Sequence, residues 1–442
     1  MADQGGSQHG IARTSRARTD EQRTLDLERI QKYHLLEEEI RSHVSQHNYT
    51  PHVFQLTSKL LKLNPEYYTI WNVRRRLLIY GLFSKPSAGS LPSTASPTSS
   101  PTATTTTSSA ACSSSLSTAT PPAPGPQTAG RSGTTADDNN NTEETHGAAE
   151  EGNQQNDLNI IKTELGFTIP LLLESPKCYW IWSYRLWILQ QAIDRLPVLV
   201  ARRIWEEELG LASKMLTKDR RNFHAWGYRR HVVEQLESSQ LGGKSMAESE
   251  FEYTTRMISQ DLSNFSAWHS RSKLIPRLLD ERKADDAARE MLLNEEFGLI
   301  CRAINVGPED QSLWYYHRSL MLNLVGFVGH PTITPAFSRD DRVTYVVREI
   351  EGIKELLEDY DDVKLIYEAL IDYTLYLCQL LGRQPDVTEK QAMTEWLAML
   401  KKLDPMRNGR WNDLERDCGL LNGGRRPKVV SIDVGQGQGQ GE

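Results

Sequence analysis

The chain of 442 residues carries 51 Lys and Arg against 58 Asp and Glu, and its apolar content of 38% is enough for one or two large cores. Acidic and basic residues are interspersed without a basic face, which makes a nucleic-acid-binding protein a poor hypothesis. No apolar run is long enough for a membrane span, and the five cysteines form no CxxC pair, so we expect a cytoplasmic protein with reduced thiols and no zinc knuckle.

Composition divides the chain into five parts. Residues 1–20 are expected to be a disordered N-terminus, and residues 21–82 a first helical repeat region. Residues 83–157 are rich in Ser, Thr, Pro and short polar runs, so they cannot bury enough apolar surface to offset their ordering entropy. We therefore predict a disordered insertion there, further helical repeats over 158–422, and a disordered Gly/Gln tail over 423–442.

The two repeat regions show helical periodicity throughout. The runs "VFQLTSKLLKL", "ARRIWEEELGLASKML" and "EMLLNEEFGLICRAI" have apolar residues spaced by three and four. Alternating runs of β-branched residues are essentially absent outside the insertion. The sequence therefore predicts an all-α protein.

A tryptophan-centred pattern follows each of these runs. Trp182, Trp226, Trp268 and Trp314 recur 42 to 46 residues apart, and Trp71 precedes Trp182 by about 36 once the insertion is subtracted. Two helices at such a period are typical of a solenoid of stacked helix hairpins. A degenerate sixth copy ends at Trp411, and residues 342–382 supply a pair without tryptophan.

The residues around each tryptophan suggest a local structure. Seven residues before it stands a capping type (Asn64, Ser175, Asp219, Asp261 or Gly307), often followed by Pro, which predicts the start of the second helix. An aromatic residue three before it and an aliphatic residue seven after it would share one buried stripe. Three residues after it, an arginine would extend from the stripe and bond carbonyls or acids of the neighbouring pair: Arg74, Arg185, Arg229 and Arg271.

Catalytic and metal-binding motifs do not emerge from the sequence. There is no HExxH, nucleophile elbow, phosphate loop or Cys/His cluster. His43 and His47 stand four apart and could face one metal ion, but with no third ligand evident we interpret them as two solvated helix residues. This chain alone therefore looks catalytically incomplete, and we expect no metal in it.

The repeats also resemble a known family. "NFHAWGYRR", "NFSAWHSRSKLIP" and "DQSLWYYHRSLM" are similar to the repeats of protein prenyltransferase α subunits. Together with "LDPMRNGRWNDL", they resemble the Rab geranylgeranyltransferase α subunit, in a compact fungal-like form, more than the α subunit of the CaaX enzymes. The resemblance covers about residues 20–82 and 158–422.

The resemblance implies a fold and an activity. The fold would be a right-handed superhelical solenoid that wraps a β subunit carrying zinc. The reaction would transfer geranylgeranyl from geranylgeranyl diphosphate, bound at the αβ interface, to C-terminal cysteines of Rab GTPases presented by Rab escort protein. Such an enzyme would act only as the αβ heterodimer.

One lysine of this chain would take part directly. In the family, the lysine of the segment P-K-x-Y, here Lys177, reaches the diphosphate, whose charge grows as the C–O bond breaks. Tyr179 could line the same cleft, although we favour a core position for it, and we expect His224 and His269 to have interface or core roles.

Two alternatives remain. One is the α subunit of a CaaX farnesyl/geranylgeranyltransferase, which would act on CaaX peptides without escort protein. The other is a non-catalytic helical-repeat scaffold, which would transfer no prenyl group with any β partner.

Overall fold

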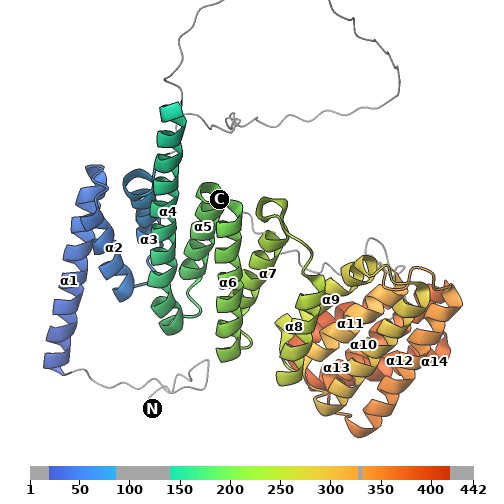
Figure 1. The fold of residues 1–442 in the computed structure, drawn as a ribbon. Coiled ribbons are helices and arrows are strands. Elements are labelled where there is room, and N and C mark those ends of the chain that lie inside the picture. The colour runs from blue at the N-terminus through green and yellow to red at the C-terminus, as the bar shows by residue number, and fades with distance from the viewer. Residues whose placement is uncertain (1–18, 86–139, 327–331, 419–442) are drawn as a thin grey trace, which may run out of the picture. The chain divides into compact units, whose positions relative to one another are not determined.

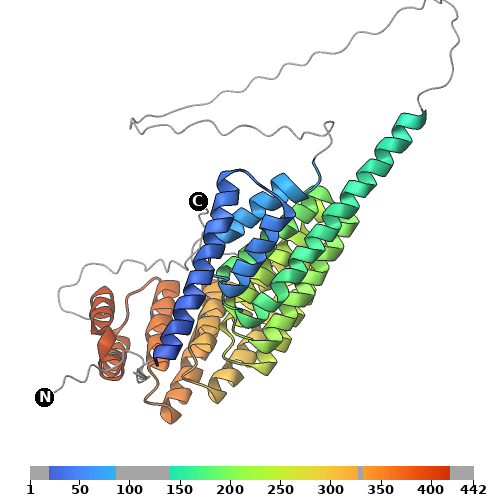
Figure 2. The ribbon, with the colours of Figure 1, turned by 90° about the vertical axis from the view of Figure 1, so that its left-hand side faces the viewer.

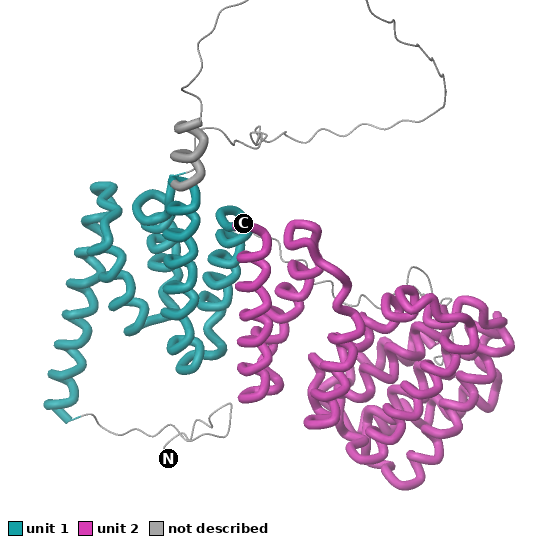
Figure 3. Tube along the Cα trace, in the orientation of Figure 1, with its two compact units in different colours: residues 1–196 teal, residues 197–442 magenta. Residues whose placement is uncertain are grey.

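A computed structural model describes residues 19–85, 140–326 and 332–418 (Figure 1). Every regular element in these ranges is helical, which confirms the all-α prediction. No described helix is long and apolar enough to cross a membrane. The chain divides at residue 196 into two compact units (Figure 3).

In the part of the first unit that the structure describes there are five α-helices, and helices close in sequence pack together. Helices α2 and α3 form one hairpin, α4 and α5 form the next, and α1 packs on α2. A single π-helical turn continues α3 up to residue 82. The bounds are α1 Asp20–Ser45, α2 Pro51–Leu63, α3 Tyr68–Leu77, η1 Leu78–Leu82, α4 Asn140–Glu174 and α5 Tyr179–Arg195.

The second unit continues the same plan, with consecutive helices packed as hairpins. The hairpin without tryptophan predicted near residues 342–382 is α12 with α13, and the degenerate sixth copy is α14 with α15. The bounds are α6 Val198–Lys218, α7 Phe223–Glu237, η2 Ser239–Leu241, α8 Ala247–Gln260, α9 Phe265–Glu281, α10 Asp286–Val306, α11 Gln311–Val325, α12 Arg339–Asp359, α13 Lys364–Leu381, α14 Val387–Leu403, η3 Pro405–Arg407 and α15 Asn408–Asp417.

The predicted insertion boundary at residue 157 is wrong, because α4 already begins at Asn140 (Figure 2). Asp157 is buried, its carboxylate accepts a bond from the Ser84 backbone N–H at 2.8 Å, and it lies 3.4 Å from the Arg195 guanidinium. The polar composition concealed this helix, since its described residues 149–157 are mostly exposed and make polar contacts, such as those of Asn156 with Leu82 and Ser84. Residues 86–139 of the insertion, the tail over 423–442 and residues 1–18 of the N-terminal segment lie outside the described residues.

The predicted start of each second helix is also wrong. The capping-type residues seven before each tryptophan end the first helix or follow it directly: Asn64 is the C-cap of α2, and Asp219 is the C-cap of α6. The second helix begins four residues later, after N-caps such as Asn222 and Asn264, whose side chains accept backbone N–H bonds. Asn, Asp and Pro suit tight turns as well as helix starts, which is why the pattern misled.

Each tryptophan fastens this turn to its own helix. The Trp71 indole N–H donates to the Pro65 carbonyl at 2.8 Å, and the Trp268 indole N–H donates to the Leu262 carbonyl at 2.8 Å. Trp182, Trp226 and Trp314 make the same bond to the carbonyl six residues back, and all five rings are buried. In α13 the hydroxyl of Tyr367 takes over this role, donating to the Asp361 carbonyl at 2.7 Å. The spacing between the turn residues and the tryptophan therefore reflects a turn that is held by the indole N–H bond to the carbonyl six residues earlier.

The indole bond gives a stability prediction. Trp268→Phe keeps a large ring but deletes the donor to Leu262, so we expect a loss of about 1–3 kcal/mol from the unpaired carbonyl and the smaller ring. Thermal unfolding followed by circular dichroism measures the change. The matched Trp396→Phe change, at a partly exposed ring in α14, should cost clearly less; equal losses would contradict a special role for the turn bond.

The corrected boundary gives a second prediction. Deletion of residues 95–130, which lie outside the described residues, should leave the melting temperature of the chain unchanged. Deletion of 84–157 should lower it, because it removes the first part of α4 and both partners of the Ser84–Asp157 bond. The measurement is differential scanning fluorimetry of the two shortened proteins beside the full chain, and equal melting temperatures would show that this bond contributes nothing.

Candidate functional site

The aromatic residues that begin the second helices are exposed. Tyr179 is 56% exposed and Phe223 is 66% exposed, so the prediction of a core position for Tyr179 is wrong. Helical side chains point back toward the N-terminus, and a residue in the first position has no preceding turn to cover it. We call the set the exposed aromatics; its members are Tyr68 and Tyr179 in the first unit and Phe223 and Phe265 in the second, together with Tyr315, which lies one turn inside α11 rather than at its start.

Lys177 lies in the short turn between α4 and α5, two residues before Tyr179, and is exposed. The buried Cys178 between them is the N-cap of α5, and burial raises the pKa of its thiol to about 11. Tyr179 and Tyr68 each lie beside the Trp180 ring, with ring centroids 5.2 and 5.3 Å apart. The first unit thus places an ammonium group and a phenol together at the start of one helix, where the helix dipole favours an anion.

The sequence reasoning missed a cation on the neighbouring helix. The guanidinium of Arg75 in α3 lies 5.7 Å from the Trp187 ring and donates to the Ser183 carbonyl at 3.4 Å. Its Nε is buried without a hydrogen-bond partner, and burial lowers the pKa of the side chain. The run "RRR" at 74–76 was the available signal, but it could not show which arginine is buried in an ion pair and which faces the aromatic rings.

His224 and His269 are half-buried in the second unit, each beside an exposed aromatic residue. The ring of Phe223 lies 4.0 Å from that of His224, and Phe265 stacks on His269 at 6.0 Å. Burial lowers the pKa of His269, and the charge of Arg230 lowers it further, so its imidazole is neutral at neutral pH. These contacts suit a surface for binding rather than a proton-transfer centre.

The arginines three residues after Trp71, Trp182, Trp226 and Trp268 are buried. Arg74 and Arg271 pair bidentately with glutamates of the following hairpin, with nitrogen–oxygen distances of 2.5 to 2.8 Å. Arg229 pairs in the same way with Glu250. A bond to an acid of the neighbouring hairpin was expected, but its enclosure in the core was not. We call these pairs the buried staples: Arg74–Glu164, Arg229–Glu250 and Arg271–Glu296.

Tyrosines complete two of these staples. Tyr184 donates its hydroxyl to Glu164 at 2.6 Å, and Tyr316 donates its hydroxyl to Glu296. Burial, reinforced by the neighbouring carboxylate, raises the pKa of both hydroxyls well above the usual value, so they remain donors. Each tyrosine lies 20 residues after its glutamate, a spacing that the sequence displays and that could have revealed the network.

Comparison with known proteins agrees with this architecture. The family described as "Protein prenyltransferase alpha subunit repeat" matches the chain five times, at residues 51–80, 161–192, 205–236, 247–278 and 293–324. Each match holds one hairpin: its tryptophan, its turn and the two helices that the turn joins.

The chain therefore carries five repeats of the protein prenyltransferase α-subunit kind.

Related proteins align with between about half and nearly all of this chain. A protein of Schizosaccharomyces pombe named "Geranylgeranyl transferase type-2 subunit alpha" is 32% identical over 49% of this chain and 63% of its own length. The Candida albicans protein of the same name is 26% identical over 92% of this chain and 97% of its own. Among solved structures, "Candida albicans protein geranylgeranyltransferase-I complexed with GGPP" aligns with 16% identity and a TM-score of 0.49, over 87% of this chain and 89% of that chain.

The two histidines considered for a metal site, His43 and His47, do not lie together. His47 follows the end of α1 in the left-handed conformation, with φ of 55°, and its ring lies beside Tyr49. His43 instead lies near Glu39 and His52, with the three ligand atoms within 4.8 Å of one another. Glu39 and His52 are exposed, and His52 lies 3.6 Å from the Glu39 carboxylate, so this group is explained by a surface ion pair.

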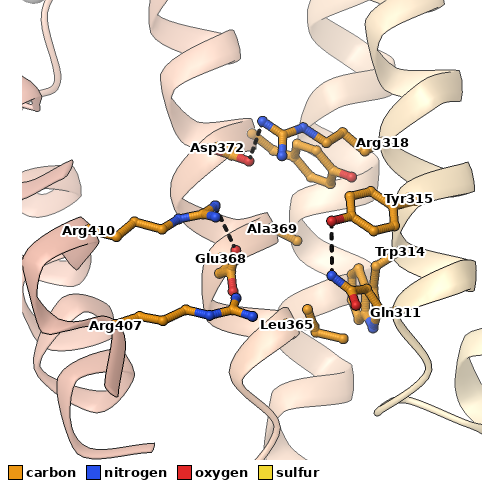
Figure 4. A pocket seen from close by; sticks show the side chains of 11 residues that line it. Gln311, Trp314, Tyr315, Arg318, Leu365, Glu368, Ala369, Asp372, Arg407 and Arg410 are labelled. Atoms are coloured by element: carbon orange, nitrogen blue, oxygen red, sulfur yellow. Dashed lines mark hydrogen bonds and ion pairs between the residues drawn. The ribbon is translucent and has the colours of Figure 1, made fainter. Parts of the chain in front are cut away.

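A charged pocket lies between α11, α13 and the last helices of the chain (Figure 4). Two ion pairs line it, Arg318 with Asp372 and Arg410 with Glu368, each at 3.1 Å. Burial raises the pKa of both carboxyl groups. Arg318 Nε and one oxygen of Glu368 are buried without a protein hydrogen-bond partner. The pocket therefore has sites for a donor and for an acceptor, which two water molecules would satisfy.

Proposed function

We propose that this chain is the α subunit of a geranylgeranyltransferase type II, active in the cytoplasm as a heterodimer with a β subunit. The observation that best supports this is the shared name of its relatives in fungi, Dictyostelium and mammals, all called type-2 subunit alpha. Two of them, from Candida albicans and Dictyostelium discoideum, align with 92% of this chain.

In the proposed reaction a geranylgeranyl group passes from its diphosphate to a C-terminal cysteine of a Rab GTPase held by Rab escort protein. The bond from carbon 1 of the lipid to oxygen breaks, a carbon–sulfur bond forms, and diphosphate leaves. Zinc in the β subunit would lower the pKa of the attacking thiol. The ammonium of Lys177 and the phenol of Tyr179 suit an anionic oxygen rather than a metal ion, so we assign them to the diphosphate.

The exposed aromatics support a large partner. Tyr68, Tyr179, Phe223, Phe265 and Tyr315 are each about half exposed or more, and aromatic side chains that combine an apolar face with a polar edge are enriched at protein interfaces. Four of them, Tyr68, Tyr179, Phe223 and Phe265, are the first residues of the second helices of successive hairpins, so one partner could contact several repeats. We infer that they bind the β subunit and that Lys177 reaches the diphosphate at the boundary between the two chains.

The test is reconstitution. The chain is co-expressed with a type-2 β subunit, the complex is purified, and transfer of radiolabelled lipid to a Rab GTPase is measured with and without Rab escort protein. Transfer that requires the escort protein supports the proposal. Efficient transfer to a CaaX peptide without escort protein would instead favour the CaaX enzyme, and no complex and no transfer with any β subunit would favour a scaffold.

A further inference from the structure

The polar network of the fifth hairpin, α10 with α11, differs from the buried staples at two of three positions: the hydroxyl residue and the arginine, but not the glutamate. In the staples, the arginine also donates Nη1 to a hydroxyl thirteen residues before the tryptophan, at 2.7 to 2.8 Å. In the fifth hairpin a cysteine replaces the hydroxyl residue and a histidine replaces the arginine, while the glutamate is kept. The hydroxyl residues are Ser58, Ser213 and Thr255, and the fifth network consists of Cys301, His317 and Glu349.

The two exchanged residues, Cys301 and His317, and the retained Glu349 bring three metal-ligand types together from three helices. The Cys301 thiol, a ring nitrogen of His317 and a Glu349 carboxylate oxygen lie within 4.8 Å of one another. Glu349 Oε2 is 3.0 Å from His317 Nε2 and 3.7 Å from Cys301 Sγ. A tetrahedral zinc ion with bonds of about 2.0–2.3 Å holds its ligand atoms about 3.3–3.7 Å apart. Small side-chain adjustments would therefore admit one ion.

The surroundings orient these groups as the outer shell of a metal site does. The hydroxyl of Tyr373 lies 2.7 Å from His317 Nδ1, which directs Nε2 toward the thiol and the carboxylate. Arg348 donates to the other oxygen of Glu349 at 3.1 and 3.2 Å. Partners of this kind fix the ring orientation and the carboxylate of metal ligands.

Charge and access also suit a divalent cation. A thiolate and a carboxylate together offset the charge of a divalent cation, and the Arg348 guanidinium that also contacts the carboxylate is half exposed to solvent. His317 and Glu349 are buried, whereas Cys301 is partly exposed and leaves a route for the ion and for a water as fourth ligand.

We propose that Cys301, His317 and Glu349 form a binding site for a divalent transition-metal ion, zinc being the one whose ligand preferences the donors match. The thiolate selects zinc over magnesium or calcium, which prefer oxygen ligands. The bound ion would hold α10, α11 and α12 together, as the arginine staples hold the earlier helices. Without the ion the same groups hydrogen-bond to one another, so occupancy depends on the zinc concentration.

The test uses the full chain without a β subunit, freed of metal by a chelator and titrated with Co²⁺ in place of zinc. We expect one equivalent to bind, with a thiolate-to-cobalt charge-transfer band in the near ultraviolet, and zinc to raise the melting temperature. Cys301→Ser and His317→Arg install residue types that the staples carry, so both should fold. Each should weaken Co²⁺ binding by at least about 100-fold, since even the supporting partners of metal ligands contribute up to that factor.

Cys378→Ser is the matched control. Its thiol also lies beside a glutamate, Glu389, but the described residues place no histidine in a metal-ligand group with it, so this variant should keep the cobalt band. Absence of the band in the full chain, or a band that survives Cys301→Ser, would overturn the proposal. Because the measurement involves no lipid transfer, its outcome is separate from that of the proposed function.

Discussion

Replacing Arg271 with methionine should destabilise the second unit by about 3–5 kcal/mol, because it leaves a buried carboxylate without its counter-charge. Glu296 is 2% exposed, and after the change it would keep only the hydroxyl bond from Tyr316. Urea unfolding followed by circular dichroism measures the loss. The double change Arg271→Met with Glu296→Leu should recover most of it, since a neutral pair of similar volume carries no burial cost for charge.

The matched control is a bidentate pair at the surface. Arg221 and Asp261 lie 2.7 Å apart, but the arginine side chain is 60% exposed. Arg221→Met should therefore cost at most about 1 kcal/mol. Similar losses for Arg221→Met and Arg271→Met, or no recovery in the double variant, would show that enclosure in the core is not what makes the staples strong.

Substituting Lys177 with alanine should lower the kcat of the reconstituted heterodimer about 100- to 1,000-fold, the range seen when one preorganised donor to a developing anion is removed. The ammonium would bind the leaving diphosphate more tightly as its charge grows, so the effect should fall on kcat more than on the KM for the Rab protein. Lys177→Arg retains the positive charge and should recover part of the rate. Single-turnover lipid transfer measures the chemical step directly.

Two measurements separate this role from a structural one. Lys62→Ala removes an exposed lysine in the last turn of α2 and should leave the rate unchanged. The Lys177→Ala heterodimer should elute from size exclusion at the same volume as the unaltered one. Normal turnover in Lys177→Ala would remove the lysine from the reaction, and dissociation of the two subunits would assign it to the interface instead.

Periodicity was enough to predict the helix hairpins and the burial of the tryptophans, because a tryptophan that recurs every 42 to 46 residues is easily recognised in a sequence. The turn between the helices was misplaced since Asn64 and Asp219 are suitable both for capping a helix and for turning the chain. The register error then carried over to Tyr179, which a helix beginning at Ser175 would have covered with an earlier turn.

The buried polar networks were not predicted from the sequence, for a different reason. Arg74 and Glu164 lie 90 residues apart, with the insertion between them, and exposed acidic residues are abundant. The available mark is the tyrosine 20 residues after Glu164 and after Glu296, and this spacing is easily overlooked among so many acidic residues. Also not predicted was the group of His317, Glu349 and Cys301, whose proximity depends on how three successive helices stack.

The staples also determine where the chain can be divided. Arg229 and Arg271 belong to the second helix of one hairpin, and their glutamates Glu250 and Glu296 belong to the first helix of the next. A fragment cut at a hairpin boundary would carry an orphaned arginine or glutamate in its newly exposed core, so such fragments should aggregate. A viable gene duplication would copy a second helix together with the first helix that follows it, one helix out of phase with the visible repeat.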